Sequence, residues 1–339
     1  MIERWIKNEL TRRRWRVFKR HRRAVAACWV LLGLIVLSLS AELWANNNPL
    51  LLYYQGQWYV PVFKYYHPTA FGRTDILQMD YRSLALHQGD WIVWPLVRWG
   101  PFERNDNVED WPSPPTIANV MGTDESGRDV LSRLLYGFRY SFAFAFTVWL
   151  FSSIIGIAIG TSMGYFGSLV DLVGQRSIEV FESIPYFLLL ITLIAIFSPN
   201  VLWLILFNTI FGWTAICQYM RGELLRLRRR EFVEGARAYG ASTTRLMFKH
   251  CLPNALTPWL TLSPFLLSGL ISTLAALDYL GFGLPPPTPS WGELFSQAQK
   301  HFRTAWWLAV FPAGALFFTL LVLNMIGEGV RAALDPRAS

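Results

Sequence analysis

The chain has 339 residues, of which 53% are hydrophobic and only 16% are charged, and its formal net charge is +8. Soluble domains usually contain about 25% charged residues, so this composition excludes an ordinary soluble enzyme and a disordered chain. The basic residues are gathered in a few segments between long apolar runs, which indicates an integral membrane protein without a nucleic-acid partner.

Six apolar runs are long enough to cross a membrane, since about 20 apolar residues span the hydrocarbon core as a helix. The fold class is therefore an all-α polytopic membrane protein. The uncharged run 183–220 is split at Ser198-Pro199-Asn200, a turn signal, into two spans. Pro185 and Pro264 lie inside spans, where a helix bundle tolerates them. The spans are expected at 24–45, 141–163, 177–197, 201–220, 257–279 and 304–327.

The distribution of Lys and Arg predicts the orientation. With both termini in the cytoplasm, the internal segments hold 21 of the 31 basic residues, and residues 1–23 alone hold 10. The positive-inside rule favours this topology. A cleaved signal peptide within residues 1–45 is the alternative, but its basic region is long, and a retained anchor on anionic lipid is preferred.

Residues 46–122 form a long aromatic-rich insertion on the outside, between the first span and the core at 123–339. The segments 57–66 and 91–100 are typical of short strands bounded by Pro and Gly. The insertion could form a cap over the bundle, seat its rings in the headgroup layer, or dock a soluble partner, and the sequence leaves all three open.

The stretch 121–141 that follows predicts an amphipathic helix along the membrane interface, because its apolar residues recur at helical spacing. Asp124 or Ser126 is a candidate cap for its first turn.

The longest internal loop, 221–256, predicts two short helices that form a knob. The first covers 231–239 and ends at Gly240. The second runs from Ser242 to Cys251 and is stopped by Pro253.

This loop resembles the EAA loop of permease subunits in ATP-binding-cassette importers. The matching residues are Glu234-Gly235-Ala236, then Gly240, and after nine residues His250-x-Leu252-Pro253. Gly235 stands where the family has Ala, and His250 where it has an aliphatic residue. The resemblance implies that the helix at 230–240 enters a cleft of a separate ATPase subunit. The implied coupling residues are Glu231, Glu234, Gly235, Ala236, Arg237, Ala238, Gly240 and Ala241, with His250, Leu252 and Pro253 as structural residues.

Two further stretches narrow the resemblance to dipeptide and oligopeptide importer permeases. GTDESGRDVLSRLLYGFRYS (122–141) resembles one signature of that family, and LDYLGFGLPPPTPSWGELFSQA (277–298) resembles another. The aromatic insertion resembles the Yej-type branch, which is associated with microcin C and peptides. The resemblance implies a MetI-like permease fold in the bacterial inner membrane that moves peptides by alternating access.

Partners follow from the same resemblance. The chain has no G-x-x-x-x-G-K-[ST] sequence and so cannot cradle ATP phosphates itself. The resemblance implies two cytoplasmic ATP-binding subunits, a second permease subunit forming a heterodimer, and a periplasmic peptide-binding protein. No enzymatic chemistry, cofactor or metal site is expected, because no Cys/His cluster has ligand spacing.

Three acidic residues fall within predicted spans, where ionisable groups are functional candidates. Glu179 and Glu182 lie near the cytoplasmic start of the third span, and Arg176 is a candidate ion-pair partner. Asp278 lies near the outer end of the fifth span and could face the translocation path. A proton-coupled secondary transporter using these acids is the alternative function, although no inverted repeat supports it. A membrane-anchored receptor or structural protein is a third, which leaves the EAA-like loop unexplained.

Overall fold

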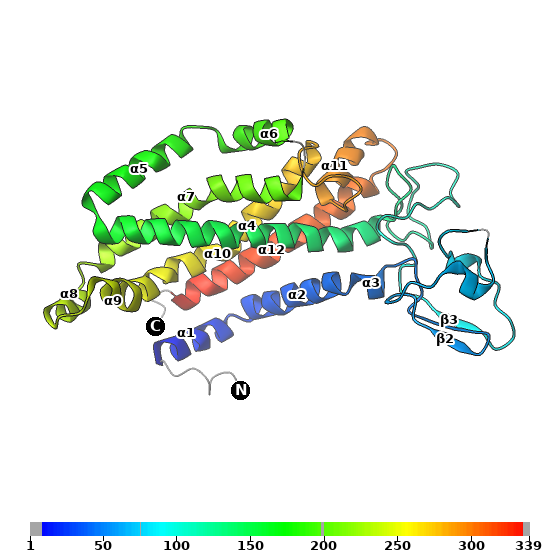
Figure 1. Cartoon of the computed structure of the whole chain (residues 1–339), viewed down its shortest axis with the longest axis horizontal. Coiled ribbons are helices and arrows are strands. Elements are labelled where there is room, and N and C mark those ends of the chain that lie inside the picture. Colours follow the sequence, from blue (N-terminus) through cyan, green and yellow to red (C-terminus); the bar gives the residue numbers. More distant parts are fainter. Residues whose placement is uncertain (1–8, 75, 198–199, 335–339) are drawn as a thin grey trace.

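The computed structural model describes residues 9–74, 76–197 and 200–334. Long helices lie side by side along the long axis of the molecule, with a small β-sheet at one end and α8 (Glu231–Ala238) at the other (Figure 1). The helix α1 (Glu9–Arg20) and the last turn of α12 (Trp307–Leu334) lie toward the α8 end. The molecule therefore has two chemically different poles joined by apolar helices.

Five helical stretches in the described part of the chain are long and apolar enough to cross a membrane, or six if one bent pair counts as a span. This confirms the predicted fold class of an α-helical membrane protein. The stretches are α2 (Arg22–Leu39), α4 (Val130–Phe166), α7 (Val201–Leu227), Thr243–Tyr279, which includes α10 (Leu252–Tyr279), and α12.

The third predicted span, 177–197, is not one straight helix. It is divided between α5 (Ser168–Glu182) and α6 (Tyr186–Phe197), which meet at 71°. Pro185 lies in the break, where it lacks an N–H and disfavours helical geometry at the residue before it. The predicted boundary at Ser198 and Pro199 lies outside the described residues, while the Asn200 side chain accepts the Leu202 N–H at 2.9 Å and caps α7.

The second span is longer than predicted, and the separate amphipathic helix at 121–141 is wrong. α4 begins at Val130 and continues unbroken to Phe166. Its N-cap is Asp129, whose carboxylate accepts the Ser132 N–H at 2.8 Å, rather than Asp124 or Ser126. Arg128 and Arg133 of this stretch are buried, and α11 (Trp291–Lys300) packs against α4 here.

The loop predicted at 221–256 is shorter than expected, because α7 extends to Leu227. The first knob helix is α8 (Glu231–Ala238), close to its predicted position. The second does not stop at Pro253. Instead α9 (Thr243–Arg245) and the π-helical segment η4 (Leu246–Cys251) run directly into α10. Pro253 does not end the helix, because it lies in the first turn of α10, where proline is tolerated.

The insertion contains a three-stranded antiparallel sheet in the order β2-β1-β3. Leu52 of β1 pairs with Tyr59 of β2 and with Ile92 of β3. The predicted segments 57–66 and 91–100 each contain one strand, whereas β1 was not anticipated. The short helix α3 (Ala41–Trp44) precedes the insertion, whose elements are β1 (Leu51–Tyr54), β2 (Gln57–Tyr59), the 3₁₀ turns η2 (Pro68–Phe71) and η3 (Tyr81–Ser83), and β3 (Trp91–Val93).

The insertion has a hydrophobic core of its own. Leu52 and Tyr54 of β1 are buried against Phe71, Met79 and Tyr81 from the two 3₁₀ turns and the segment between them. Tyr54, Tyr59 and Tyr81 each make ring contacts with Phe71. The aromatic residues of the insertion therefore pack largely on one another, and its role as a cap or as a docking surface stays a prediction.

Candidate functional site

α8 is a two-turn helix that protrudes at the pole opposite the sheet (Figure 1). It ends in a Schellman motif, in which Gly240 N–H bonds the Arg237 carbonyl at 2.9 Å and Ala241 N–H bonds the Ala236 carbonyl at 3.1 Å. Gly240 has φ +80°, a conformation that residues with a side chain rarely adopt. The predicted helix terminator is therefore confirmed.

The inner face of α8 is anchored to the membrane helices. Val233 is fully buried and joins Leu224 and Leu227 of α7 in one apolar cluster. Leu246 and Cys251 of η4 and Ala255 of α10 complete it, and the half-buried Ala236 and Ala241 pack against it. A force on α8 is consequently transmitted to α7 and α10 together.

The outer face of α8 is open. Glu231, Glu234 and Arg237 are exposed, and the helix is flanked by Phe232, 47% exposed, and Tyr239, 96% exposed. Among the residues that the structure describes, none forms a hydrogen bond or ion pair with the Glu234 carboxylate. A β-carbon at Gly235 would meet nothing within 4 Å. Exposed aromatic rings such as those of Phe232 and Tyr239 are typical of protein interfaces.

The residues that end the EAA-like motif build the start of α10. Leu252 N–H bonds the Met247 carbonyl, five residues back, and its side chain packs against the apolar cluster under α8. The Asn254 side-chain amide donates to the His250 carbonyl at 2.7 Å. This bond satisfies one carbonyl near Pro253, which has no N–H to offer.

Two arginines tie the end of α7 to the turn between α4 and α5. The Arg221 guanidinium holds Asp171 through two nitrogens, with Nη2 to Oδ2 at 2.8 Å. Arg228 Nη1 donates to the Tyr165 carbonyl at 3.0 Å. These contacts connect the base of the α8 knob to a second pair of membrane helices.

Between these arginine contacts and the sheet pole, the backbones of α4 and α7 lie in direct contact. β-carbons at Gly156 and Gly164 would lie 2.7 Å from the Trp213 carbonyl and 2.6 Å from the Arg221 carbonyl, and one at Gly160 would collide with the Cys217 carbonyl. Glycines four residues apart allow such close approach in membranes. The two helices are therefore in close contact along this glycine face.

The pole that carries the sheet is held by a buried charge cluster. Arg128 binds Asp124 at 2.7 Å and Glu293 at 2.8 Å, and the fully buried Arg133 also pairs with Glu293. Burial opposes the charged form of Arg128, but Asp124 and Glu293 outweigh it and raise the pKa of its guanidinium. The cluster joins the loop before α4, the first turn of α4 and α11, and we call these four residues the clasp.

Tryptophan side chains reinforce the clasp. Trp291 Nε1 donates to the Leu134 carbonyl at 3.0 Å, and Trp307 Nε1 donates to the Thr123 carbonyl at 3.0 Å. Gly122 and Gly137 lie against these rings, because a β-carbon would come within 2.7 Å of Trp307 or 2.9 Å of Trp291. The segments 122–141 and 277–298 thus pack on each other.

Asp278 lies beside the clasp at the end of α10. Its side chain is buried, and its two oxygens accept Leu284 N–H at 2.6 Å and the Ser290 hydroxyl at 2.5 Å. A β-carbon at Gly283 would collide with this carboxylate. The carboxylate organises the turn between α10 and α11, and its participation in a translocation path stays a prediction.

The two glutamates of α5 differ in their partners. Glu179 pairs with Arg176 at 2.5 Å, as predicted, and both side chains are exposed. Glu182 accepts a hydrogen bond from Gln218 Nε2 of α7 at 2.8 Å. Glu182 also lines a cavity of about 490 Å³ that lies inside the α5–α6 bend and is walled by α7 and α10.

Comparison with known proteins assigns the family. The model of the binding-protein-dependent transport system inner membrane component matches residues 156–339, just over half of the chain. The chain belongs to this family. The model of the N-terminal transmembrane domain of oligopeptide transport permease C matches residues 9–62 of the permease.

Individual relatives agree with this assignment. The permease is 40% identical to the inner membrane ABC transporter permease protein YejE of Escherichia coli, over 95% of this chain and 96% of that protein. It is 37% identical to the peptidoglycan transport system permease protein YejE of Agrobacterium fabrum, over 96% and 93%. A structure of the MetNI methionine ABC transporter in an inward-facing conformation has the same fold, with TM-score 0.50 and 20% identity over 60% of this chain and 97% of that one.

Membership of the family confirms the predicted MetI-like permease and its class of function. The permease is a transport subunit of an ATP-binding-cassette importer in the inner membrane, with an ATPase and a binding protein as partners. The secondary transporter and the anchored receptor are not supported.

Sequence reasoning missed the elements that connect the two poles. The signal for α4–α7 contact was available in the spacing of Gly156, Gly160 and Gly164. The clasp carried a weaker signal, since Arg133 and Glu293 lie in two different signature stretches whose contact the sequence does not reveal.

Proposed function

We propose that this permease moves peptides or peptide-like compounds across the inner membrane by alternating access. Its support is the names of similar proteins: the Agrobacterium relative is a peptidoglycan transport permease, and a relative from Pseudomonas aeruginosa, 33% identical over 64% of this chain, is a di/tripeptide transport permease. The substrate differs between those proteins, but each contains peptide bonds or peptide-linked sugars.

We further propose that α8 is the coupling helix that enters a cleft of the ATPase. The observation that carries this proposal is the asymmetry of α8, with Val233 buried among α7 and α10 while Glu234 is exposed and unpartnered among the described residues. Docking would bury Glu234, and a buried carboxylate needs a cationic or N–H partner on the ATPase. Gly235, Ala236 and Ala238 would then allow the two backbones to approach.

The orientation follows from this coupling role. With α8 in the cytoplasm, α1 and the last turn of α12 lie on the same side, and both termini are cytoplasmic. Residues 46–122 and the clasp are then periplasmic, where the peptide-binding protein docks. The excess of basic residues on the α8 side supports this arrangement.

A second permease subunit covers the face that contains the α5–α6 bend. Glu182 and Gln218 lie on this face beside the 490 Å³ cavity. Polar groups of this kind are costly against lipid tails, so a protein partner or an aqueous path is the better neighbour. The resemblance to peptide importers favours a homologous, non-identical partner, with Glu182 near the shared path.

The test is uptake into proteoliposomes that contain the purified complex with its binding protein. Peptide uptake should require internal ATP and survive a proton ionophore. Cysteine placed at Gly235 should cross-link to the ATPase, whereas cysteine placed at Gly314, in the second turn of α12, should not. Uptake that follows the proton gradient without ATP would overturn the transport proposal, and cross-linking at both positions would overturn the coupling assignment.

A further inference from the structure

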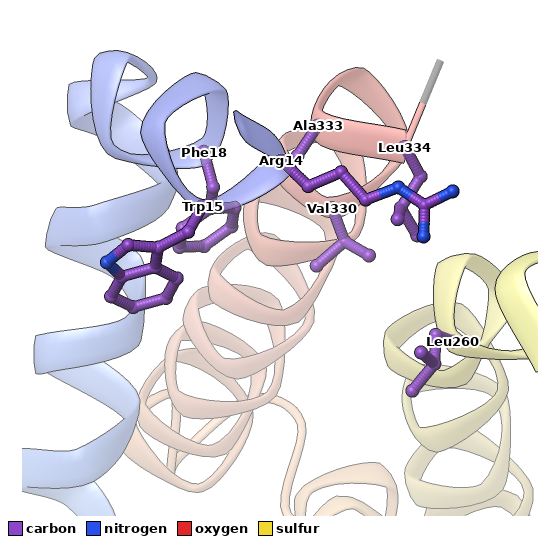
Figure 2. Close-up of a pocket in the computed structure, with 7 residues that line it drawn as sticks. All are labelled: Arg14, Trp15, Phe18, Leu260, Val330, Ala333 and Leu334. Atoms are coloured by element: carbon purple, nitrogen blue, oxygen red, sulfur yellow. The ribbon is translucent and has the colours of Figure 1, made fainter. Parts of the chain in front are cut away.

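An apolar groove lies at the α8 pole, between α1, α10 and the last turns of α12 (Figure 2). Its volume is about 470 Å³. It is separate from the α8 surface and from the cavity at the α5–α6 bend. Its lining residues are Arg14, Trp15, Phe18, Leu260, Val330, Ala333 and Leu334.

The groove has apolar walls and one cation. Figure 2 shows the Arg14 side chain extending from α1 across the end of α12, with its guanidinium on the side of Leu334 and toward α10. No hydrogen bond or ion pair joins Arg14 to the described residues. α1 carries six basic residues and one acidic residue, Glu9, so the potential at the mouth of the groove is positive.

The groove is held open by tight packing on its α1 side. A β-carbon at Gly329 of α12 would collide with Ala24 of α2 and lie 3.2 Å from the Phe18 ring. Trp15 stacks on Phe18 with ring centres 5.9 Å apart, and Lys19 lies over the Trp15 ring. α1 is thereby fixed against α12, while Leu260 of α10 closes the opposite wall.

The position of the groove indicates its ligand. α2, a candidate membrane span, begins at Arg22, directly after α1, so the groove lies near the end of a span, where lipid headgroups are expected. A ligand from this region has acyl chains for the apolar walls and a phosphate for the guanidinium. Among the lining side chains only the Arg14 guanidinium and the Trp15 indole N–H can donate hydrogen bonds, and none can accept one, so a neutral polar solute is poorly matched to these walls.

We propose that the groove binds one anionic phospholipid, with its phosphate at Arg14 and an acyl chain between Phe18, Val330 and Leu260. The lipid would lie between α1, which carries Arg14 and Phe18, and Leu260 on the opposite wall, and so would bridge α1 and α10. The assignment to the cytoplasmic leaflet rests on the orientation proposed above, whereas the binding of the lipid does not.

The test is native mass spectrometry of the full-length permease in its complex, titrated with dioleoyl phosphatidylglycerol. Arg14→Gln should weaken binding of this lipid about fivefold, the effect of one basic residue near an anionic headgroup. The matched control is Arg13→Gln, which removes the same charge from an exposed neighbour that does not line the groove. Leu260→Trp should fill the groove and weaken binding without changing charge.

Three further arms identify the occupant. Dioleoyl phosphatidylcholine should bind more weakly than phosphatidylglycerol and respond less to Arg14→Gln, and glycerol 3-phosphate, which lacks acyl chains, should not compete.

Equal losses for Arg13→Gln and Arg14→Gln would overturn the proposal in favour of diffuse attraction to the membrane. The last control is a permease truncated after Leu334. If it binds more lipid than the full-length permease, and Arg14→Gln does not weaken that binding, the occupant of the groove is the chain's own C-terminal segment and the proposal is overturned. If Arg14→Gln lowers the melting temperature of the lipid-free permease, its loss of binding can no longer be attributed to the missing charge. The effect of Leu260→Trp on lipid binding then decides the test. Failure of the lipid proposal leaves ATP-driven uptake unchanged, so the two proposals are tested separately.

Discussion

Arg133 and Glu293 form an ion pair that joins the first turn of α4 to α11 across 160 positions of the sequence. Arg133 is fully buried and also donates to the Pro101 carbonyl at 3.1 Å. The pair lies where the two signature segments meet, so it fixes the loops at the sheet pole to the ends of the membrane helices. Its energetic role is that of a buried charge that must stay paired.

Replacement of Arg133 by Met should therefore destabilise the permease. Without Arg133, Glu293 still has Arg128 as an ion-pair partner, but the buried Pro101 carbonyl loses its donor, and an orphaned buried acceptor costs about 1–3 kcal/mol. Thermal denaturation of the purified complex measures the loss. Arg176→Met is the control, because the Arg176–Glu179 pair is exposed and such pairs contribute about 0–1 kcal/mol. Equal melting temperatures for the two variants would refute the role of the clasp.

Gly160→Ala should separate α4 from α7. The added β-carbon would collide with the Cys217 carbonyl, and forcing extra volume into a tight contact costs about 1–3 kcal/mol. Gly222→Ala in α7 is the matched control, since its β-carbon meets nothing within 4 Å and removing a helical glycine stabilises by about 0.5–1 kcal/mol. The melting temperature should fall for Gly160→Ala and rise for Gly222→Ala. An unchanged melting temperature for Gly160→Ala would show that the α4–α7 contact tolerates the added β-carbon.

The membrane helices could be predicted because lipid selects apolar residues whatever their packing. The predicted span 304–327 lies within α12 almost entirely, and the predicted span 257–279 lies wholly within α10. Proline shows the limit of this reasoning. Pro185 lies in a 71° break, whereas Pro258 and Pro264 lie inside the continuous α10. Whether a proline breaks a helix depends on neighbours that satisfy the freed carbonyl, and those come from tertiary structure.

The candidate site divides in the same way. Local sequence predicted α8 and its end at Gly240, because a glycine C-cap depends on backbone conformation at one residue. It did not predict the contact of Arg133 with Glu293 or of Arg221 with Asp171, since each joins elements far apart in the chain. Asp278 illustrates the consequence, because an acid in a predicted span indicates function until its hydrogen-bond partners are known.

The stability of the permease should depend on pH through Asp129. Burial raises the pKa of this carboxyl to about 6, and neighbouring Asp124 adds to the shift. An unfolded aspartate has a pKa of about 3.9. Between about pH 4 and about pH 6 the folded protein keeps a proton that the unfolded chain has released, so the free energy of unfolding falls as pH rises, by about 2–3 kcal/mol in total.

Asp129→Asn should remove this pH dependence while retaining an oxygen that accepts the Ser132 N–H. Melting temperatures of wild type and variant, compared across the same pH range, measure the difference in slope. Asp106→Asn, at an exposed aspartate of the same loop region, should keep the wild-type slope. Parallel curves for wild type and Asp129→Asn would show that Asp129 does not titrate in this range.

Glu234→Lys should uncouple ATP hydrolysis from transport. The residue is exposed on α8 and makes no contact that supports the fold in the described part of the chain, so membrane insertion and melting temperature should stay at wild-type values. In the docked complex a lysine would place a cation where a buried carboxylate is expected, at a cost of several kcal/mol to docking. Peptide uptake and co-purification of the ATPase should both fall at least tenfold. Glu328→Lys makes the same charge change on α12 at the same pole and should leave both unchanged. Wild-type uptake by the Glu234→Lys permease would remove Glu234 from the coupling surface.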